Sequence, residues 1–142
     1  MAVAAVYLVL LSEGKILLSK RANTGYEDGN YGLVAGHVET GETLRQAMAR
    51  EALEEAGLVI AEADLDLALT MHRRSPSSKP PERLDFFMTA TKYTGELTNK
   101  EPDKCTDLAW FGRNAPPENL ITYIREALNL IAEDVRYSEY GW

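Results

Sequence analysis

The sequence has a single cysteine, no long apolar run and fewer basic than acidic residues. Cys105 has no second thiol to pair with, so no intrachain disulfide forms, which fits a reducing compartment. The longest apolar stretch, near the N-terminus, is too short to span a bilayer and lacks the basic start of a signal peptide. With 15 Lys and Arg against 22 Asp and Glu, the chain also lacks the basic stripe of a nucleic-acid binder. We therefore expect a cytoplasmic protein that binds neither a membrane nor a nucleic acid polymer.

The length of 142 residues suits one hydrophobic core, and we expect a single domain over residues 1–142. The nearest thing to a linker is the stretch RRSPSSKPPE, residues 73–82, which is too short to separate two domains of viable size. Its serines and prolines predict a loop at the surface.

Runs of apolar residues between turn residues predict several strands and two helices. The strands are expected at residues 2–11, 15–20, 33–36, 65–72, 83–93 and 107–111, the first two forming a hairpin. A last helix is expected after Asn119, its N-cap. The apolar face of this helix consists of Leu120, Tyr123, Ile124, Ala127, Leu128 and Ile131. This order favours an α/β fold in which a mixed sheet carries helices on both faces.

Residues 44–56 are predicted to form the other helix. Thr43 and Gln46 form a capping-box pattern, and Gly57 stands where a helix ends in a left-handed residue. The face expected to pack on the sheet consists of Met48, Ala49, Ala52, Leu53 and Ala56.

Three carboxylates, Glu51, Glu54 and Glu55, lie next to that apolar face within an arc of about 100°. Glu51 and Glu55 form a like-charge i,i+4 pair, and all three lie in the half of the helix where the macrodipole disfavours anions. A divalent cation would reverse both effects, because Mg²⁺ and Mn²⁺ prefer carboxylate oxygens. A solvated acidic face, common on surface helices, explains the helix equally well when the helix is taken alone.

The wider pattern decides between these two interpretations. Gly36, five residues, Glu42, seven residues and then REALEEAGL at residues 50–58 resemble the Nudix box. That motif is G-x5-E-x7-R-E-U-x-E-E-x-G-U, in which U is a bulky aliphatic residue. Every charged and glycine position matches, while Ala52 is small for the first aliphatic position. By this resemblance the chain is identified as a member of the Nudix family.

The resemblance implies an α/β/α sandwich that hydrolyses nucleoside diphosphates linked to another group, with Mg²⁺ or Mn²⁺ as cofactor. It implies that Glu54 and Glu55 bind the metal, with Glu55 as the principal ligand. The backbone carbonyl of Gly36 would be a further ligand. Glu51 would bind metal or serve as the general base that activates water.

Four more residues receive roles from the same resemblance. Arg50 and Glu42 would form an ion pair that positions the helix. Arg21 ends a segment that looks like the second strand of MutT-like members, where an arginine contacts phosphate; the alternative is a surface charge at a strand end. Tyr123 would form a wall of the base pocket, between the sheet and the start of the last helix, or would simply anchor the core.

The segment NKEPDKCTDLAWF, residues 99–111, resembles a branch of MutT-like nucleoside triphosphate pyrophosphohydrolases. The leading interpretation is therefore hydrolysis of a small-molecule nucleoside triphosphate to a monophosphate and pyrophosphate. The alternatives are hydrolysis of ADP-ribose, a dinucleotide or a nucleotide sugar, and a catalytically silent module that binds nucleotide. The protein is expected to be a monomer or a homodimer.

Some residues carry no firm assignment in the sequence. A further acidic metal ligand remains open among Asp85, Glu82 and Glu101. His37 and His72 are expected to pack or to form hydrogen bonds, since a Mg²⁺ site is rich in oxygen. Cys105 is expected to be a small buried thiol. The aromatic tail, residues 136–142, either docks on its own domain or contacts a second copy.

Overall fold

The computed structural model describes residues 1–142, and it contains all six expected strands and both helices, together with two short strands, Tyr31–Gly32 and Tyr137–Tyr140, that the sequence does not predict. The strands are β1 (Val3–Ser12), β2 (Lys15–Arg21), β3 (Tyr31–Gly32), β4 (Ala35–His37), β5 (Asp66–Arg74), β6 (Glu82–Ala90), β7 (Cys105–Gly112) and β8 (Tyr137–Tyr140). The helices are α1 (Leu44–Ala56), α2 (Thr122–Ala132) and the short 3-10 helix η1 (Glu62–Asp64). The predicted helix 44–56 and the hairpin of the first two strands are confirmed.

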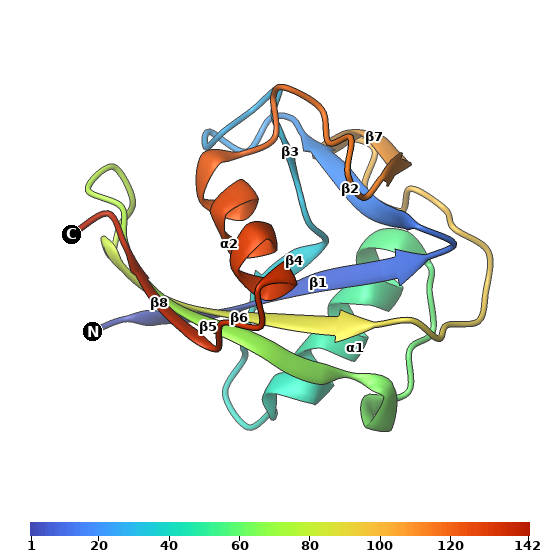
Figure 1. The fold of residues 1–142 in the computed structure, drawn as a ribbon, viewed down its shortest axis with the longest axis horizontal. Coiled ribbons are helices and arrows are strands. Elements are labelled where there is room, and N and C mark those ends of the chain that lie inside the picture. The colour runs from blue at the N-terminus through green and yellow to red at the C-terminus, as the bar shows by residue number, and fades with distance from the viewer.

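One mixed sheet runs in the order β3-β2-β1-β6-β5-β8, with β4 beside β1 and β7 beside β2. β1 and β6 are parallel partners from Val3 opposite Arg83 to Leu10 opposite Ala90. β5 pairs antiparallel with β6, and β8 joins the outer edge of β5 in parallel. The helices α1 and α2 lie on opposite faces of β1, β6 and β5 (Figure 1). The expected α/β/α arrangement is confirmed.

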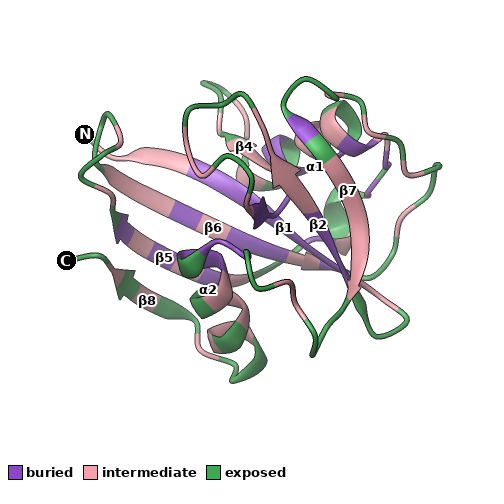
Figure 2. Cartoon of the chain, turned by 90° about the horizontal axis from the view of Figure 1, so that it is seen from above, coloured by how far each residue is buried: buried purple, intermediate pink, exposed green.

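Each face of the sheet has its own apolar core, because successive side chains of a strand point to opposite faces. On β1, Tyr7 and Val9 belong to the cluster under α2, whereas Val6 and Leu8 belong to the cluster under α1. Figure 2 shows buried residues along the middle of β1, β6 and β5. Burying one such side chain contributes about 1.5–3 kcal/mol, so each helix is held by its own set of apolar contacts.

The ends of α1 are fixed by the caps that the sequence predicts. The hydroxyl of Thr43 accepts a hydrogen bond from the backbone of Gln46, and the Gln46 side chain accepts one from the backbone N–H of Thr43. Gly57 closes the helix with φ of 69°, and its N–H donates to the carbonyls of Ala52 and Leu53. These caps and the burial of Ala52 set the rotation of α1 on the sheet, and with it the direction of the glutamates.

Two predictions about helix residues are wrong. Leu53, expected on the sheet-facing side, has half of its surface exposed, because the buried face of α1 is rotated toward Ala47 and Met48 and away from Leu53. The buried side chains of α1 are Ala47, Met48, Ala52 and Ala56. Asn119 does not cap α2, which begins at Thr122 after Ile121. The Asn119 side chain instead donates to the carbonyl of Gly29 at 2.8 Å and ties down the loop before β3.

The surface loop predicted over residues 73–82 is shorter in the structure. β5 continues through Arg74 and β6 begins at Glu82, so the loop covers residues 75–81 only. Arg73, predicted to lie in the loop, is a strand residue with 4% of its surface exposed. The three prolines that favour a loop all lie between the two strands, at the tip of the β5–β6 hairpin. The charged residues on either side of them continue the strands.

The C-terminal tail docks on its own domain. Tyr137 to Tyr140 pair with Thr70 to Arg73 of β5, and Trp142 Nε1 donates to the carbonyl of His72 at 3.0 Å. This strand covers the open edge of β5. No helix in the chain has both the length and the apolar character needed to cross a membrane.

Candidate active site

Five acidic side chains line a cavity of about 530 Å³ on the α1 side of β4, one of them Glu39 in the loop after that strand. Glu51, Glu54 and Glu55 come from the last turns of α1, and Glu101 comes from the loop before β7. The structure thus brings together the three predicted carboxylates. It adds Glu101, one of the three further acids that the sequence leaves open.

The two other open candidates lie outside this cavity. Asp85 is fully buried and accepts a hydrogen bond from Arg73. Glu82 lies at the start of β6, and its carboxylate is 2.7 Å from His72 Nε2. Of the three, only Glu101 lies beside the glutamates of α1, where it could bind the same metal. Residue spacing does not predict this position, because it depends on how the loop 91–104 folds back onto α1.

Arg50 connects most of the charged residues of the motif. Its guanidinium holds Glu42 with two hydrogen bonds, Nε to Oε2 at 3.0 Å and Nη2 to Oε1 at 2.6 Å. Nη1 donates to Glu51 at 2.8 Å and to Glu54 at 3.2 Å, and Nη2 donates to the carbonyl of His37 at 3.2 Å. The ion pair expected between Arg50 and Glu42 is therefore present, and it links the loop after β4 to α1.

The backbone of β4 passes directly over the glutamates. A Cβ added to Gly36 would overlap the carboxyl group of Glu51, so this position needs glycine for close approach. The N–H of Ala35 donates to Glu55 Oε2 at 3.2 Å. Burial raises the pKa of Glu55 to about 9, and the negative charges of Glu51 and Glu101 add to the rise. Burial also raises the pKa of Glu51.

This donor set fits a divalent cation. Carboxylate oxygens and a backbone carbonyl are the ligands that Mg²⁺ prefers, and a cation would counter both the burial and the nearby negative charges that raise the pKa of Glu55. In the structure no three acidic, His or Cys side chains converge on one metal position. Arg50 holds the carboxylates of Glu51 and Glu54 on the side of these helix turns that faces Glu42.

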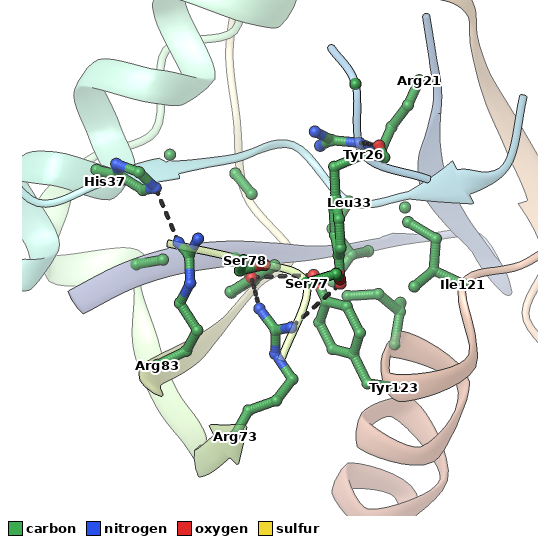
Figure 3. A pocket seen from close by; sticks show the side chains of 17 residues that line it. Arg21, Tyr26, Leu33, His37, Arg73, Ser77, Ser78, Arg83, Ile121 and Tyr123 are labelled. Atoms are coloured by element: carbon green, nitrogen blue, oxygen red, sulfur yellow. Dashed lines mark hydrogen bonds between the residues drawn. The ribbon is translucent and has the colours of Figure 1, made fainter. Parts of the chain in front are cut away.

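A second cavity, of about 490 Å³, lies on the other face of β4, between the sheet and the start of α2 (Figure 3). Its walls include Tyr26, Leu33, Ile121 and Tyr123. Arg21 lines both cavities, and it is held by hydrogen bonds to the Tyr26 carbonyl at 2.8 Å and to Thr24 Oγ1 at 3.1 Å. Arg21 therefore lies where the acidic cavity meets the aromatic one.

Tyr123 both anchors the core and lines the second cavity. Its surface is 7% exposed, and its hydroxyl lies 3.1 Å from that of Tyr7. The guanidinium of Arg73 lies 3.8 Å from the centre of its ring. Arg73 covers one face of the Tyr123 ring, so little of the ring is left for contact with a nucleotide base. That contact remains a prediction.

Arg73 and Arg83 are site residues that no sequence motif indicates. Both line the second cavity, and they are direct partners in the β5–β6 pairing. Arg83 Nη1 lies 3.2 Å from His37 Nε2. Burial lowers the pKa of His37, and the nearby charge of Arg83 lowers it further. If the predicted strands 65–72 and 83–93 are joined as a hairpin and the first is lengthened by a residue, Arg73 and Arg83 come to lie opposite each other on the same face of the sheet.

Cys105 lines the acidic cavity, whereas His72 lies outside both cavities. Cys105 is buried, and its sulfur accepts a hydrogen bond from Ser19 Oγ at 3.1 Å, which agrees with a small buried thiol. His72 contacts Glu82 and the ring of Trp142, outside both cavities.

Comparison with known proteins gives matches along most of the chain. A family model, the NUDIX domain, matches residues 1–131. The NAD-capped RNA hydrolase NudC of Vibrio cholerae is 34% identical over 115 residues, which cover 79% of this chain and 38% of NudC. The NudC of Pasteurella multocida is 33% identical over 118 residues, covering 78% of this chain and 42% of that protein. The chain spans less than half the length of these curated relatives.

Solved structures show the same fold. The MutT NUDIX hydrolase from Burkholderia pseudomallei aligns with a TM-score of 0.82 at 26% identity, covering 91% of this chain and 97% of that one. A MutT protein from Methanosarcina mazei Go1 aligns with a TM-score of 0.76 at 20% identity, covering 94% of each chain. Because the family model covers residues 1–131 and the motif lies on α1 as the family requires, the chain belongs to the Nudix hydrolase family.

Proposed function

We propose that this chain hydrolyses a nucleoside triphosphate to a nucleoside monophosphate and pyrophosphate, with Mg²⁺ or Mn²⁺ as cofactor. The proposal rests on one observation, the meeting of two unlike cavities at Arg21. The acidic cavity contains carboxylates and no aromatic side chain, so it suits metal-bound phosphates. The second contains tyrosines and aliphatic side chains, so it suits one nucleoside. A ligand with a nucleoside at one end and phosphates at the other matches this pair.

Glu54, Glu55 and Gly36, through its carbonyl, would hold the cation, and Glu51 would either join them as a ligand or act as the base. When bound, the cation neutralises phosphate charge and lowers the pKa of a bound water. Arg21, between the cavities, would bind a phosphate oxygen of the substrate through the part of its guanidinium that faces away from Tyr26.

The protein side chains would then complete hydrolysis of a phosphoanhydride bond. Water attacks one phosphorus, the bond from that phosphorus to the bridging oxygen breaks, and the proton of the water passes to Glu51. Arg50 directs the Glu51 carboxylate by a hydrogen bond of 2.8 Å, and Glu42 fixes Arg50 in turn. This arrangement supports Glu51 as the leading candidate for the base.

A second candidate substrate class is a dinucleotide. The observation in its favour is the 34% identity to NudC, whose name gives NAD-capped RNA as the substrate of that protein. A dinucleotide would place its second nucleoside in or beside the acidic cavity. The lack of an aromatic wall there favours the triphosphate instead.

A panel of purified nucleotides tests the proposal. Purified protein is incubated with Mg²⁺ and with ATP, GTP, CTP, UTP, ADP-ribose or NAD, and the products are separated by anion-exchange chromatography. The expected result is that one or more triphosphates turn over faster than NAD and ADP-ribose. Faster turnover of NAD would favour the dinucleotide. Nucleotide binding without turnover of any compound would make the chain a silent binding module.

A further inference from the structure

The second cavity carries a positive charge that a nucleoside does not need. The whole chain has a net charge of −7, yet none of the 17 residues that line this cavity is an Asp or a Glu. Three of them are arginines: Arg21, Arg73 and Arg83. Arg21 borders the acidic cavity, whereas Arg73 and Arg83 line only the second one.

The positions of Arg73 and Arg83 are unfavourable without an anion nearby. They are direct partners across β5 and β6, and like charges placed in this way destabilise a sheet. A single carboxylate, Asp85, lies beside them, and its hydrogen bond goes to Arg73 Nε. The charge of Arg83 therefore has no carboxylate partner of its own within 4 Å.

Unused hydrogen-bond donors of both guanidiniums remain at this end of the cavity. Arg73 donates to Asp85, to Tyr26 Oη at 3.2 Å and to Tyr7 Oη at 3.4 Å, so two of its five N–H groups have no partner. Arg83 makes one hydrogen bond, to His37, and its Nε is buried without any partner, as is one acceptor, Oδ1 of Asp85. A buried unpaired donor is costly, so a ligand that supplies an acceptor would be favoured here.

Two hydroxyl groups complete the surroundings. Ser77 and Ser78, in the loop between β5 and β6, line the same cavity, and the Ser78 hydroxyl donates to Ser75 Oγ at 3.1 Å, which leaves its oxygen lone pairs and the Ser77 hydroxyl free. Figure 3 shows both serines on the side of Arg73 and Arg83, with Arg21 on the opposite side of the cavity. Guanidinium groups together with hydroxyl groups are typical partners of phosphate oxygens.

We propose that Arg83 and Arg73, with Ser77 and Ser78, bind a second phosphate of the substrate, distinct from the phosphates at the glutamates. The inference rests on the proposed function, because it takes the second cavity as the nucleoside site. It specifies the substrate class as a nucleotide that carries another phosphate on the ribose side of its nucleoside. That phosphate has two chemical sources: a phosphate ester on the ribose, or the phosphodiester that links the nucleoside to a following nucleotide.

Binding measured without turnover tests this site directly. Isothermal titration calorimetry compares AMP with adenosine 2′,5′-bisphosphate, adenosine 3′,5′-bisphosphate and the dinucleotide pApA, which carries the second phosphate as a diester. The variants are Arg83→Gln, which removes the charge, and Arg83→Lys, which keeps it. Arg74→Gln is the matched control, because Arg74 is the next residue of β5, is exposed and lines neither cavity. Thermal melting establishes that each variant is folded.

In the wild-type protein and in Arg74→Gln, at least one ligand with a second phosphate should bind about tenfold or more tightly than AMP, the effect of a charge-assisted hydrogen bond. The ratio should fall toward one in Arg83→Gln and be partly kept in Arg83→Lys. Tighter binding of the bisphosphates alone assigns the site to a ribose phosphate, and tighter binding of pApA alone assigns it to a nucleic acid 5′ end.

Equal binding of AMP and of every ligand with a second phosphate by the wild-type protein would overturn the inference. The same ratio in wild type and Arg83→Gln would overturn it as well. Neither result depends on triphosphate turnover. The proposed function is tested separately, by the nucleotide panel.

Discussion

Replacing Glu55 by glutamine separates the folding role of this side chain from its expected metal-binding role. Burial and the charges of Glu51 and Glu101 raise the pKa of Glu55 to about 9, from an ordinary value of 4.5. At pH 7 without metal, the folded protein therefore holds Glu55 in its protonated form. A glutamine has nearly the same shape as a protonated glutamate and carries no charge. The Glu55→Gln variant should thus fold with wild-type stability at pH 5.

The dependence on pH follows from proton linkage. Between pH 4.5 and about 9 the folded wild-type protein retains a proton on Glu55 that the unfolded chain has lost. The unfolded state then binds fewer protons, so wild-type stability falls as the pH rises. The slope is at most about 1.4 kcal/mol per pH unit for one group. Glu55→Gln removes this term, so without metal the variant should become the more stable protein as the pH rises toward 9.

A divalent cation should reverse this order. At a concentration about a hundredfold above its Kd, Mg²⁺ or Mn²⁺ bound only to the folded state stabilises it by about 2.7 kcal/mol. For a chain of this size, that corresponds to a rise in melting temperature of about 5–10 °C. Most of this rise should be absent in Glu55→Gln.

Differential scanning fluorimetry at pH 5, 7 and 9, with EDTA or with excess metal, measures both effects. Glu126→Gln is the matched control, because it makes the same charge change on an exposed position of α2 that lines neither cavity. If metal raised the melting temperatures of wild type and Glu55→Gln equally, Glu55 would not be a metal ligand, and the metal would bind at other residues.

Three further substitutions test other parts of the site. Glu51→Gln should lower kcat by about a hundredfold or more with folding intact, and wild-type turnover of this variant would exclude Glu51 both as base and as essential ligand. Gly36→Ala should displace the Glu51 carboxyl, which its new Cβ would overlap, so kcat should fall at least about tenfold in steady-state assays; unchanged kcat would show that β4 moves away freely. Tyr123→Leu should lower the melting temperature by several degrees, because it loses the contacts to Tyr7 and Arg73, and it should also raise KM for the best nucleotide. A melting temperature equal to that of wild type would remove Tyr123 from the core.

The parts of the fold that depend on local signals were predictable from the sequence. The capping box at Thr43 and the left-handed Gly57 define α1 to the residue, and the spacing of its side chains places Glu51 and Glu55 beside the buried face. The same reasoning fails for Leu53, since helical spacing alone does not fix how far the buried face of α1 is rotated toward Ala47 and Met48. Asn119 fails for a related reason, because its side chain forms a tertiary hydrogen bond to Gly29 in place of a cap.

The second cavity depends on contacts between distant segments, so local patterns do not indicate it. The sequence pattern predicts that Arg73 belongs to a charged surface loop, whereas the pairing of β5 with β6 buries it opposite Arg83. Glu101 is similar, because only the fold of its loop brings it beside Glu55. The motif could thus be read along the chain, but the residues expected to select the substrate come together only through the sheet.

The most direct test of the central claim is ³¹P NMR of a nucleoside triphosphate incubated with the wild-type protein and Mg²⁺. The account predicts that the triphosphate signals give way to those of a nucleoside monophosphate and pyrophosphate. The conversion should stop with EDTA and be at least about a hundredfold slower with Glu51→Gln. Release of a nucleoside diphosphate and inorganic phosphate, or no conversion of any nucleoside triphosphate at full metal occupancy, would contradict it.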